Sequence, residues 1–324
     1  MTTTFTPQAP IGSGFGASST AKEVVAGNDL TGKNVIVTGG YSGLGIEVTR
    51  ALVGAGASVT VPARRPDVAR DALDGLDVEV ATLDLGDLAS VRAFAESYLA
   101  TGKQLDILIN NAAIMAAPLT RIGDGWESQF ATNHLGHFAL TNLLWPALAK
   151  ANGARVVELS SSGHKLSDIR WDDLGFATDY DKWTAYGQAK TANSLFAVKL
   201  DELGQKDNVR AFAVHPGGIM TPLQRHLPRE EMIASDWMDE EGNVNSRFKS
   251  TEQGAATTVW AATSPRLSGM GGVYCEDCDI ARPTEAASSD ARIAGVNAHA
   301  IDRDSADRLW TLSADLTGIN AFAD

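Results

Sequence analysis

The chain has 324 residues, of which 44% are hydrophobic and 21% charged, the composition of an ordinary soluble globular protein. Its formal net charge of −13 argues against a nucleic-acid partner or an anionic-membrane surface, and no apolar run approaches the roughly 20 residues of a membrane span. The N-terminus lacks a basic region followed by an apolar stretch, so we expect no secretory signal. With two cysteines only, we expect a cytoplasmic protein without a disulfide framework.

The first 30 residues are expected to lie outside the main domain. Met1 to about Ser18 is rich in Thr, Gly, Ser and Pro and is interpreted as a mobile tail. Ser19 or Thr20 is expected to cap a short helix over Ala21–Val25.

Between residues 31 and 282, short β-branched runs alternate with longer helix-periodic segments. The predicted strands are Asn34–Thr38, Ser58–Val61, Val78–Thr82, Leu105–Asn110, Arg155–Ser160, Val209–Val214 and Gly272–Tyr274. The predicted helices are Gly43–Ala55, Asp67–Asp74, Leu88–Leu99, Trp126–Ala151, Trp183–Leu203 and Thr251–Thr263. Apolar strands separated by helices predict an α/β fold, a single-domain Rossmann-type doubly wound sheet of about seven parallel strands.

Two segments break this alternation. Residues 217–250 interrupt it inside the domain, and residues 283–324 follow it as a C-terminal helical extension. In the extension, Leu309, Trp310 and Leu312 predict an amphipathic helix.

A glycine-rich loop joins the first predicted strand to the first helix of the domain. Its glycines, spaced Gly-x-x-x-Gly-x-Gly, permit a tight turn and the approach of a pyrophosphate to the positive end of the helix. A plain turn is the alternative, because this spacing differs from the commonest dinucleotide fingerprint. Its position in the alternating pattern favours nucleotide binding. The predicted contacts here are Gly39, Tyr41, Ser42, Gly43, Leu44 and Gly45.

The end of the second strand bears on the choice of cofactor. NAD-binding proteins place a carboxylate there for the ribose 2′-hydroxyl, whereas an Arg accommodates the 2′-phosphate of NADP. This strand ends in Arg64 and Arg65 with no carboxylate, so NADP(H) is predicted as the preferred cofactor. NAD(H) remains the alternative if the two arginines are a solvated surface pair.

The ends of the third and fourth strands carry further candidate cofactor contacts. Asp84 and Leu85 are expected to position the adenine, and the small residues of Asn111-Ala112-Ala113 suit close backbone approach. Ordinary strand-to-helix turns would also explain both segments, because Asp and Asn favour turns without any ligand.

A tyrosine and a lysine lie four residues apart on one face of a predicted helix. A phenol has a reference pKa of about 10, and a neighbouring ammonium lowers it. Tyr186 beside Lys190 is therefore a candidate general acid or base. The pair also occurs by chance in many helices, and its meaning depends on the other motifs.

Together these motifs resemble the short-chain dehydrogenase/reductase family over residues 31 to 282. They are Thr38–Gly45, Asn110–Ala113, a serine within Ser160–Ser162, Tyr186–Lys190 and Pro216-Gly217. Within the family the chain most resembles the branch of retinol-dehydrogenase-like and WW-domain-oxidoreductase-like enzymes, because Asn133–Phe138 matches a motif of that branch. Unlike several retinoid enzymes, it is expected to lack a membrane segment before the core, which weakens a retinoid assignment.

The resemblance implies a catalytic tetrad of Asn133, Ser161, Tyr186 and Lys190. Tyr186 would exchange the proton on the substrate oxygen, Ser161 would hydrogen-bond that oxygen, and Lys190 would lower the tyrosine pKa and hold the nicotinamide ribose. Asn133 would support a proton-relay water. Ser160 and Ser162 remain alternatives to Ser161. The resemblance also implies cofactor contacts from Tyr186, Lys190, Pro216, Gly217, Ile219 and Thr221.

The chain departs from the family pattern at Ala113, where the family has Gly, and at Glu158, where the branch usually has Asn. A buried carboxylate at position 158 would need a partner. His134 and His137 are interpreted as packed or hydrogen-bonded histidines. Cys275 and Cys278 are interpreted as structural, because tetrahedral zinc needs four ligands and no second pair is present; no metal site is predicted.

The expected substrate pocket borders on two regions. Trp171, Phe176, Tyr180 and Trp183 are candidates either for core packing or for one pocket wall. The resemblance makes residues 217–250 the substrate lid, whose Met220, Leu223, Met232, Trp237 and Met238 suggest a hydrophobic substrate.

The sequence therefore predicts an NADP-dependent oxidoreductase that interconverts an alcohol and a ketone or aldehyde on a hydrophobic small molecule. An NAD-linked dehydrogenase and a non-catalytic nucleotide-binding redox sensor are the alternatives. Relatives in the family often assemble through the two long helices that are predicted here over Trp126–Ala151 and Trp183–Leu203, so a homo-oligomer is a further expectation by analogy.

Overall fold

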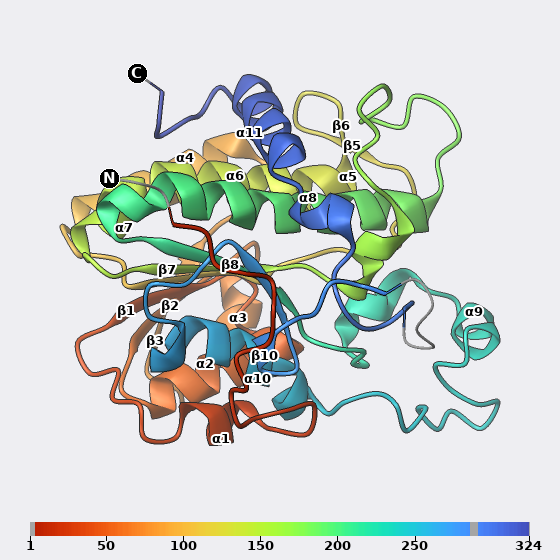
Figure 1. Cartoon of the computed structure of the whole chain (residues 1–324), viewed down its shortest axis with the longest axis horizontal. Helices are drawn as coiled ribbons and strands as arrows, with labels where there is room; N and C mark the ends of the chain where they lie inside the picture. The colour runs from red at the N-terminus through yellow and green to blue at the C-terminus, as the bar shows by residue number, and fades with distance from the viewer. Residues whose placement is uncertain (1–3, 286–290, 324) are drawn as a thin grey trace.

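A computed structural model describes residues 4–285 and 291–323 of the chain. At its centre lies one eight-stranded sheet in the order β10-β9-β8-β7-β4-β1-β2-β3 (Figure 1). Its strands are β1 (Asn34–Val37), β2 (Ser58–Ala63), β3 (Val78–Thr82), β4 (Ile107–Asn110), β7 (Arg155–Leu159), β8 (Arg210–His215), β9 (Val273–Glu276) and β10 (Asp279–Ile280). Seven strands run parallel, as predicted, and β10 adds an antiparallel edge.

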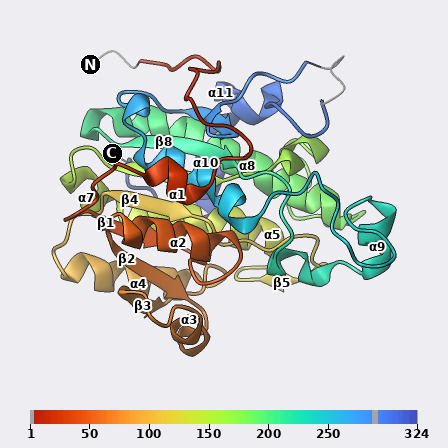
Figure 2. The ribbon, with the colours of Figure 1, turned by 90° about the horizontal axis from the view of Figure 1, so that it is seen from below.

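Alternate residues of the buried strands face two separate helical layers. On one side, Ile36, Leu108 and Val156 pack beneath α4 (Leu88–Ala100), α6 (Gly136–Leu143) and α8 (Lys182–Gly204). On the other, Val35 and Ile109 pack against α1 (Ala21–Val25), α2 (Leu44–Gly54) and α10 (Thr251–Thr263). Figure 2 shows α1, α2 and α10 gathered on their face of the sheet. Burial of each strand on both faces explains the continuous apolar runs in the sequence.

The chain winds outward in two directions from the centre of the sheet. From β1 it proceeds through β2 and β3 to one edge, and from β4 it proceeds through β7, β8 and β9 toward the other. β1 and β4 are therefore neighbours at the point where the strand order reverses, and their register pairs Ile36 with Leu108. In such sheets, ligands bind beyond the carboxyl ends of the strands at this point.

The helix predicted over Trp126–Ala151 is wrong in its outline. Its first residues form β6 (Trp126–Glu127), which pairs with β5 (Arg121–Ile122) in a hairpin. The remainder is divided into α5 (Ser128–Phe130), a π-helical turn η1 (Ala131–Leu135), α6, and α7 (Trp145–Lys150). α5 begins where it does because the Glu127 carboxylate accepts the amides of residues 129 and 130. Pro146, which has no amide hydrogen, follows the break between α6 and α7.

Residues 4–18 do not project from the body as the predicted mobile tail would. The Gln8 side chain donates to the carbonyls of Tyr274 and Ala281 and accepts from the Tyr274 amide. The Asp279 carboxylate accepts the amides of residues 11–13. The segment therefore follows the β9–β10 edge of the sheet before α1, which Thr20 caps by accepting from the Glu23 amide.

The remaining elements lie around this core. They are α3 (Pro66–Ala72), the 3-10 turns η2 (Ser162–Leu166), η3 (Gln205–Asp207), η4 (Pro222–His226), η5 (Pro265–Leu267) and η6 (Ala298–Ile301), α9 (Arg229–Ala234), and α11 (Arg303–Thr317). α11 is the amphipathic helix predicted from Leu309, Trp310 and Leu312, and it buries the first two. None of the described helices is both long enough and apolar enough to span a bilayer.

Candidate active site

The phosphate loop folds tightly because glycine occupies each crowded position. Gly39 and Gly43 have positive φ values of 64° and 55°. A Cβ at Gly45 would lie 2.2 Å from the Gly39 carbonyl oxygen. Gly45 thus lets α2 begin directly behind the turn, so that the free amides at its start face the cavity beyond the sheet.

Thr38 joins the ends of β1 and β4. Its Oγ1 accepts the amides of Asn111 and Ala112 at 2.9 and 3.0 Å, and its carbonyl accepts the Asn111 Nδ2 amide at 2.8 Å. A Cβ at Gly39 would lie 3.1 Å from the Ala112 Cα. The two strand ends therefore form one backbone floor at the reversal point of the sheet.

Above this floor lies a cavity of about 940 Å³. The predicted site residues that line it are Gly39, Tyr41, Ser42, Gly43, Leu44, Arg64, Arg65, Asp84, Leu85, Asn111, Ala112, Ala113, Ser161, Tyr186, Lys190, Pro216, Gly217, Ile219 and Thr221. Ser160 and Ser162 also reach it. The ends of six strands (β1, β2, β3, β4, β7 and β8), the start of α8 and the lid segment thus border one space.

Two predicted site residues do not line the cavity. Gly45 lies behind Gly39, where its role is to make room for the turn. Asn133 is fully buried in the π-helical turn, where its side chain accepts from the Ile114 amide and donates to the Ile114 carbonyl, both at 2.9 Å. Asn133 therefore holds the segment after β4, which forms part of the wall.

The three serines after β7 have different surroundings. Ser160 Oγ is buried and donates to the Lys190 carbonyl at 2.8 Å, which commits it to the backbone of α8. Ser161 Oγ accepts the Gly163 amide at 3.0 Å. It also lies beside the Tyr186 phenol, and hydrogen bonding from Ser161 acts to lower the pKa of that phenol. Ser162 hydrogen-bonds through its backbone amide to His215. Of the three, Ser161 is therefore the one whose hydroxyl lies beside Tyr186.

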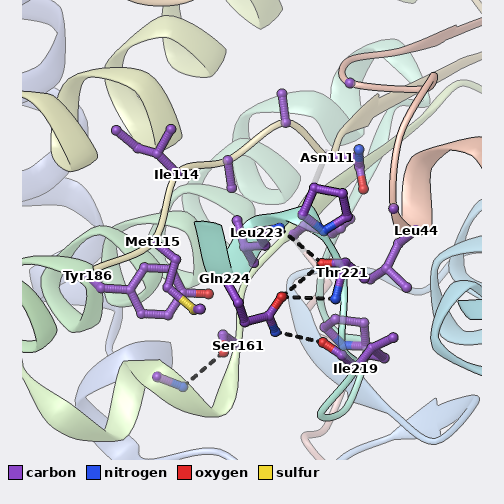
Figure 3. Close-up of a pocket in the computed structure, with 18 of the residues that line it drawn as sticks. Leu44, Asn111, Ile114, Met115, Ser161, Tyr186, Ile219, Thr221, Leu223 and Gln224 are labelled. Carbon is purple, nitrogen blue, oxygen red and sulfur yellow. Dashed lines mark hydrogen bonds between the residues drawn. The ribbon is translucent and has the colours of Figure 1, made fainter. Parts of the chain in front are cut away.

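Tyr186 and Lys190 lie in the first turns of α8, and both line the cavity. Figure 3 shows the Tyr186 ring beside Met115. Lys190 Nζ donates to the Leu159 carbonyl at 2.7 Å and lies 5.7 Å from the centre of the Tyr186 ring. A Cβ at Gly163 would lie 2.7 Å from Tyr186 Cε1, so this glycine gives the ring its space.

Burial shifts the proton affinities of both groups. It raises the pKa of Tyr186 to about 12, against the lowering effect of the Ser161 hydrogen bond. It lowers the pKa of Lys190 to about 8, against the negative charge of Glu158. The net shift of the Tyr186 pKa is therefore upward, opposite to the lowering expected from Lys190, because burial is the larger effect.

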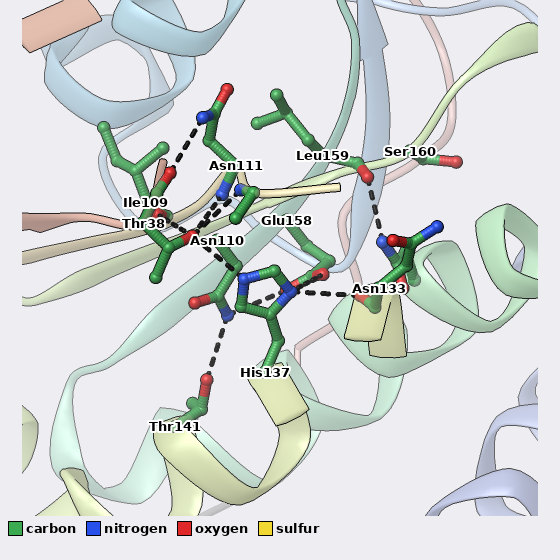
Figure 4. A network of polar contacts seen from close by, with 12 residues as sticks. Thr38, Ile109, Asn110, Asn111, Asn133, His137, Thr141, Glu158, Leu159 and Ser160 are labelled. Atoms are coloured by element: carbon green, nitrogen blue, oxygen red, sulfur yellow. Dashed lines mark hydrogen bonds and ion pairs between the residues drawn. The ribbon is translucent and has the colours of Figure 1, made fainter. Parts of the chain in front are cut away.

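A buried polar network lies directly behind the floor (Figure 4). His137 Nδ1 lies 3.0 Å from the Asn133 carbonyl oxygen, and Nε2 lies 2.9 Å from Thr38 Oγ1. Because a carbonyl only accepts, Nδ1 carries the proton, and the Thr38 hydroxyl donates to Nε2. Burial lowers the pKa of His137 to about 4, which agrees with this neutral tautomer. His137 therefore connects the predicted tetrad asparagine to the phosphate-loop threonine.

Glu158 belongs to the same network. Its Oε2 accepts from Asn110 Nδ2 at 2.8 Å, and its Oε1 lies 3.8 Å from His137 Nδ1. Burial raises the pKa of this carboxyl well above its ordinary value, while the Asn110 hydrogen bond and the charge of Lys190 oppose the rise. The partner that a buried Glu158 requires is therefore an amide, with the Lys190 ammonium as the nearby charge.

The cavity wall beside Tyr186 is apolar. Met115 and Leu227 pack with Tyr186 in a small cluster whose outer members include Trp183, Leu223 and Trp237. Of the four aromatics that precede Tyr186, Trp183 lines the cavity, whereas Phe176 is buried and Tyr180 donates to the Ala117 carbonyl. Sequence reasoning missed Met115 and Phe248 as wall residues, because neither belongs to a motif or a periodic run.

The two cysteines lie away from this cavity, at the β9–β10 hairpin. Both are buried free thiols, and burial raises the pKa of Cys278 to about 11. Asp277 and Cys278 adopt positive φ values of 48° and 59° and form the turn of the hairpin. Within the described ranges, no group of three or more His, Cys, Asp or Glu side chains is arranged to hold a metal ion.

The chain is similar to known proteins along most of its length. The family model described as short chain dehydrogenase matches residues 33–232. A "Probable oxidoreductase" of Streptomyces lividans is 46% identical, and the alignment covers 80% of this chain and 89% of that protein. "Retinol dehydrogenase 12" of Mus musculus is 39% identical over 75% of this chain and 70% of its own length.

Solved structures agree with these matches. A "putative uncharacterized protein from Mycobacterium Paratuberculosis" is 33% identical and superposes with a TM-score of 0.72, over 93% of this chain and 98% of that one. The "Pseudomonas aeruginosa RhlG/NADP active-site complex" has the same fold, with a TM-score of 0.59 at 24% identity over 76% of this chain and 95% of its own. From the match of the family model and of these relatives, the chain belongs to the short-chain dehydrogenase family of oxidoreductases, which bind a nicotinamide dinucleotide.

Proposed function

We propose that this protein is an NADP-dependent oxidoreductase that interconverts an alcohol and a ketone or aldehyde on a hydrophobic small molecule. The observation that carries the proposal is the meeting of Ser161, Tyr186 and Lys190 in one cavity with the phosphate loop and an apolar wall.

The residues present fit a dinucleotide. The backbone cradle between Gly39 and Ala112 has no room for further side-chain atoms, and the start of α2 offers free amides to a pyrophosphate. At the end of β2, Arg64 and Arg65 line the cavity, and neither forms an ion pair with a carboxylate in the described part of the chain. This arrangement supports the preference for a 2′-phosphate over a 2′-hydroxyl.

The bound cofactor would supply or accept the hydride, and the chain would manage position and protons. In the direction of reduction, Tyr186 Oη donates its proton to the substrate oxygen, a role that its raised pKa permits at neutral pH. Ser161 Oγ hydrogen-bonds the same oxygen as charge develops on it. Lys190, held by the Leu159 carbonyl, keeps a positive charge beside the tyrosine. The roles reverse for oxidation.

The apolar wall supports the class of substrate. Ile114, Met115 and Trp237 line the cavity together with Leu223 and Phe248, and surfaces of this kind bind hydrocarbon or aromatic groups. The similarity to a protein named retinol dehydrogenase 12 also favours a hydrophobic alcohol or carbonyl compound.

The proposal is tested by nicotinamide absorbance with a panel of hydrophobic ketones, aldehydes and alcohols, offered with NADPH/NADP and NADH/NAD in parallel. We expect turnover with the phosphorylated cofactor. Tyr186→Phe should lower kcat by about 10²- to 10⁴-fold, because it removes the proton donor, while the Kd for NADPH stays the same. Near-normal turnover by Tyr186→Phe would refute the mechanism, and equal use of NADH would refute the cofactor preference.

A further inference from the structure

A third arginine lines the cavity near the end of β2. Arg225 lies in η4, a 3-10 turn near the start of the lid segment, and it borders the same cavity as Arg64 and Arg65. Its Nη1 donates to the Pro222 carbonyl of its own turn at 3.1 Å. None of the ion pairs found among the described residues includes any of these three arginines. In a chain of net charge −13, three arginines that border one cavity without an ion pair to a carboxylate mark a region that favours an anion, although Asp84 and Asp236 line other parts of the same cavity.

Arg225 lies close to Arg64 at the end of β2 and to Tyr41 in the phosphate loop. Partial burial, and next the positive charge of Arg64, lower the pKa of the Arg225 guanidinium, whereas the phenol of Tyr41 in the phosphate loop raises it. Two like charges at close range repel each other unless an anion lies between them. A phosphate dianion, which guanidinium groups bind in a bidentate manner, would turn this repulsion into attraction.

The structure also explains how the lid segment reaches this place. Thr221 caps η4, and Gln224 completes the capping box while its amide donates to the Ile219 carbonyl at 2.7 Å. Thr221 rests on the phosphate loop, since a Cβ at Gly43 would lie 3.3 Å from the Thr221 Cβ. Figure 3 shows Thr221, Gln224 and Ile219 joined by these bonds beside Leu44. The start of the lid is therefore fixed against the phosphate loop, and Arg225 follows the capping box directly.

We propose that Arg225 is a second guanidinium for the 2′-phosphate of the cofactor, so that the lid segment takes part in the recognition of the phosphorylated cofactor. The inference rests on the proposed NADP-dependent function and adds a residue from outside the β2 end to its cofactor recognition. Through Arg225, the affinity for the 2′-phosphate would depend on the lid segment, which also borders the substrate space at Leu223.

The test is equilibrium binding, by calorimetry, of NADP⁺, NAD⁺, adenosine 2′,5′-bisphosphate and 5′-AMP to the full-length chain. Arg225→Gln should weaken the binding of NADP⁺ and of the bisphosphate by about 10- to 100-fold, because it removes charged hydrogen bonds to the phosphate. Binding of NAD⁺ and 5′-AMP should stay within about twofold. Arg225 is exposed at the rim, so the substitution leaves the core intact.

Arg229→Gln is the matched control, because it removes the same charge from α9 of the same segment. The Arg229 guanidinium donates to the Glu240 carbonyl and does not line the cavity. We expect the binding of all four ligands to remain as in the unmodified chain.

Two results would overturn the inference. Equal weakening of NADP⁺ and NAD⁺ by Arg225→Gln would place the guanidinium on the pyrophosphate, and unchanged binding of NADP⁺ would make it an ordinary surface charge. The variant Arg64→Gln distinguishes a failure of the inference about Arg225 from a failure of the proposed function. If Arg64→Gln weakens NADP⁺ and Arg225→Gln does not, the lid inference alone fails. If the unmodified chain binds NAD⁺ as tightly as NADP⁺, both fail.

Discussion

Lys190 is a buried cation whose charge depends on a buried acid. Burial lowers the pKa of Lys190 to about 8, and the negative charge of Glu158 opposes this lowering. Because the ammonium is needed beside Tyr186, kcat/KM for carbonyl reduction should be level at neutral pH and fall as the pH rises through about 8. A pH profile measured with NADPH, with the cofactor saturating, would show this alkaline limb.

The variant Glu158→Gln keeps the shape and the acceptor of the side chain but removes its charge. Since that charge holds the Lys190 pKa up, the alkaline limb should move to lower pH. Glu79→Gln, a change at an exposed carboxylate paired with Lys103, serves as the control and should leave the limb in place. An unmoved limb in Glu158→Gln would mean that Glu158 is already protonated in the active enzyme.

Among individual residues, the sequence predicted which side chains meet in the cavity better than it predicted the contacts that support them. Tyr186, Lys190 and Ser161 were predicted from motif spacing and family resemblance, and all three line one cavity. The contacts of Glu158 with Asn110 and His137 were not predictable, because residues 48 and 21 positions away meet only when β4, β7 and α6 are assembled. Arg225 belongs to no motif, and only the folded lid brings it near Arg64.

Among the elements, α8 depends on close packing against η2. A Cβ at Gly187 would lie 2.9 Å from both the Gly163 carbonyl oxygen and the Leu166 Cβ. Gly187→Ala should therefore force α8 and η2 apart and lower the free energy of unfolding by about 1–3 kcal/mol. Turnover should fall as well, because Ser161 is the N-cap residue of η2 and would move with it. Urea denaturation and kcat measure the two effects.

A glycine-to-alanine substitution at the end of α2 should instead raise the free energy of unfolding. Gly54 lies at the end of α2, and a Cβ there meets no atom within 4 Å. Gly54→Ala should thus raise the free energy of unfolding by about 0.5–1 kcal/mol through helix propensity. If Gly187→Ala proved as stable as Gly54→Ala, the close packing of α8 on η2 would be refuted.

Elements with a strong local pattern were predictable, and those set by distant contacts were not. Thr251–Thr263 has the predicted bounds, and its N-cap Ser250 and Gln253 form a capping box that the local sequence contains. Residues 4–18 have a composition typical of mobile segments. Their order depends on Gln8 and Asp279, which lie at opposite ends of the chain. β10, with two residues, is too short to give a periodic signal.

For the molecule as a whole, α11 occupies the face that the family resemblance assigns to assembly. Trp310 stacks on Phe196 of α8 with ring centres 5.7 Å apart and meets Phe138 of α6 at 4.9 Å. Ser313 hydrogen-bonds His134 at 2.7 Å, and Leu309 is buried in the same cluster. Figure 1 shows α11 lying across α6 and α8. The chain thus covers with its own helix the apolar surface through which relatives are expected to pair.

We therefore expect the full chain to be a monomer, with a mass near 34.2 kDa by light scattering coupled to size exclusion. A variant that ends at residue 302 would uncover Phe138 and Phe196, and buried aromatic surface of this size drives association once it is exposed. It should appear as dimers or larger species at the concentration at which the full chain is monomeric. Lys199→Ala in the full chain is the control, because it removes the ion pair with Asp307 at the rim of α11 without uncovering the aromatic cluster. A dimeric full chain, or a monomeric truncated one, would show that α11 does not take the place of a partner subunit.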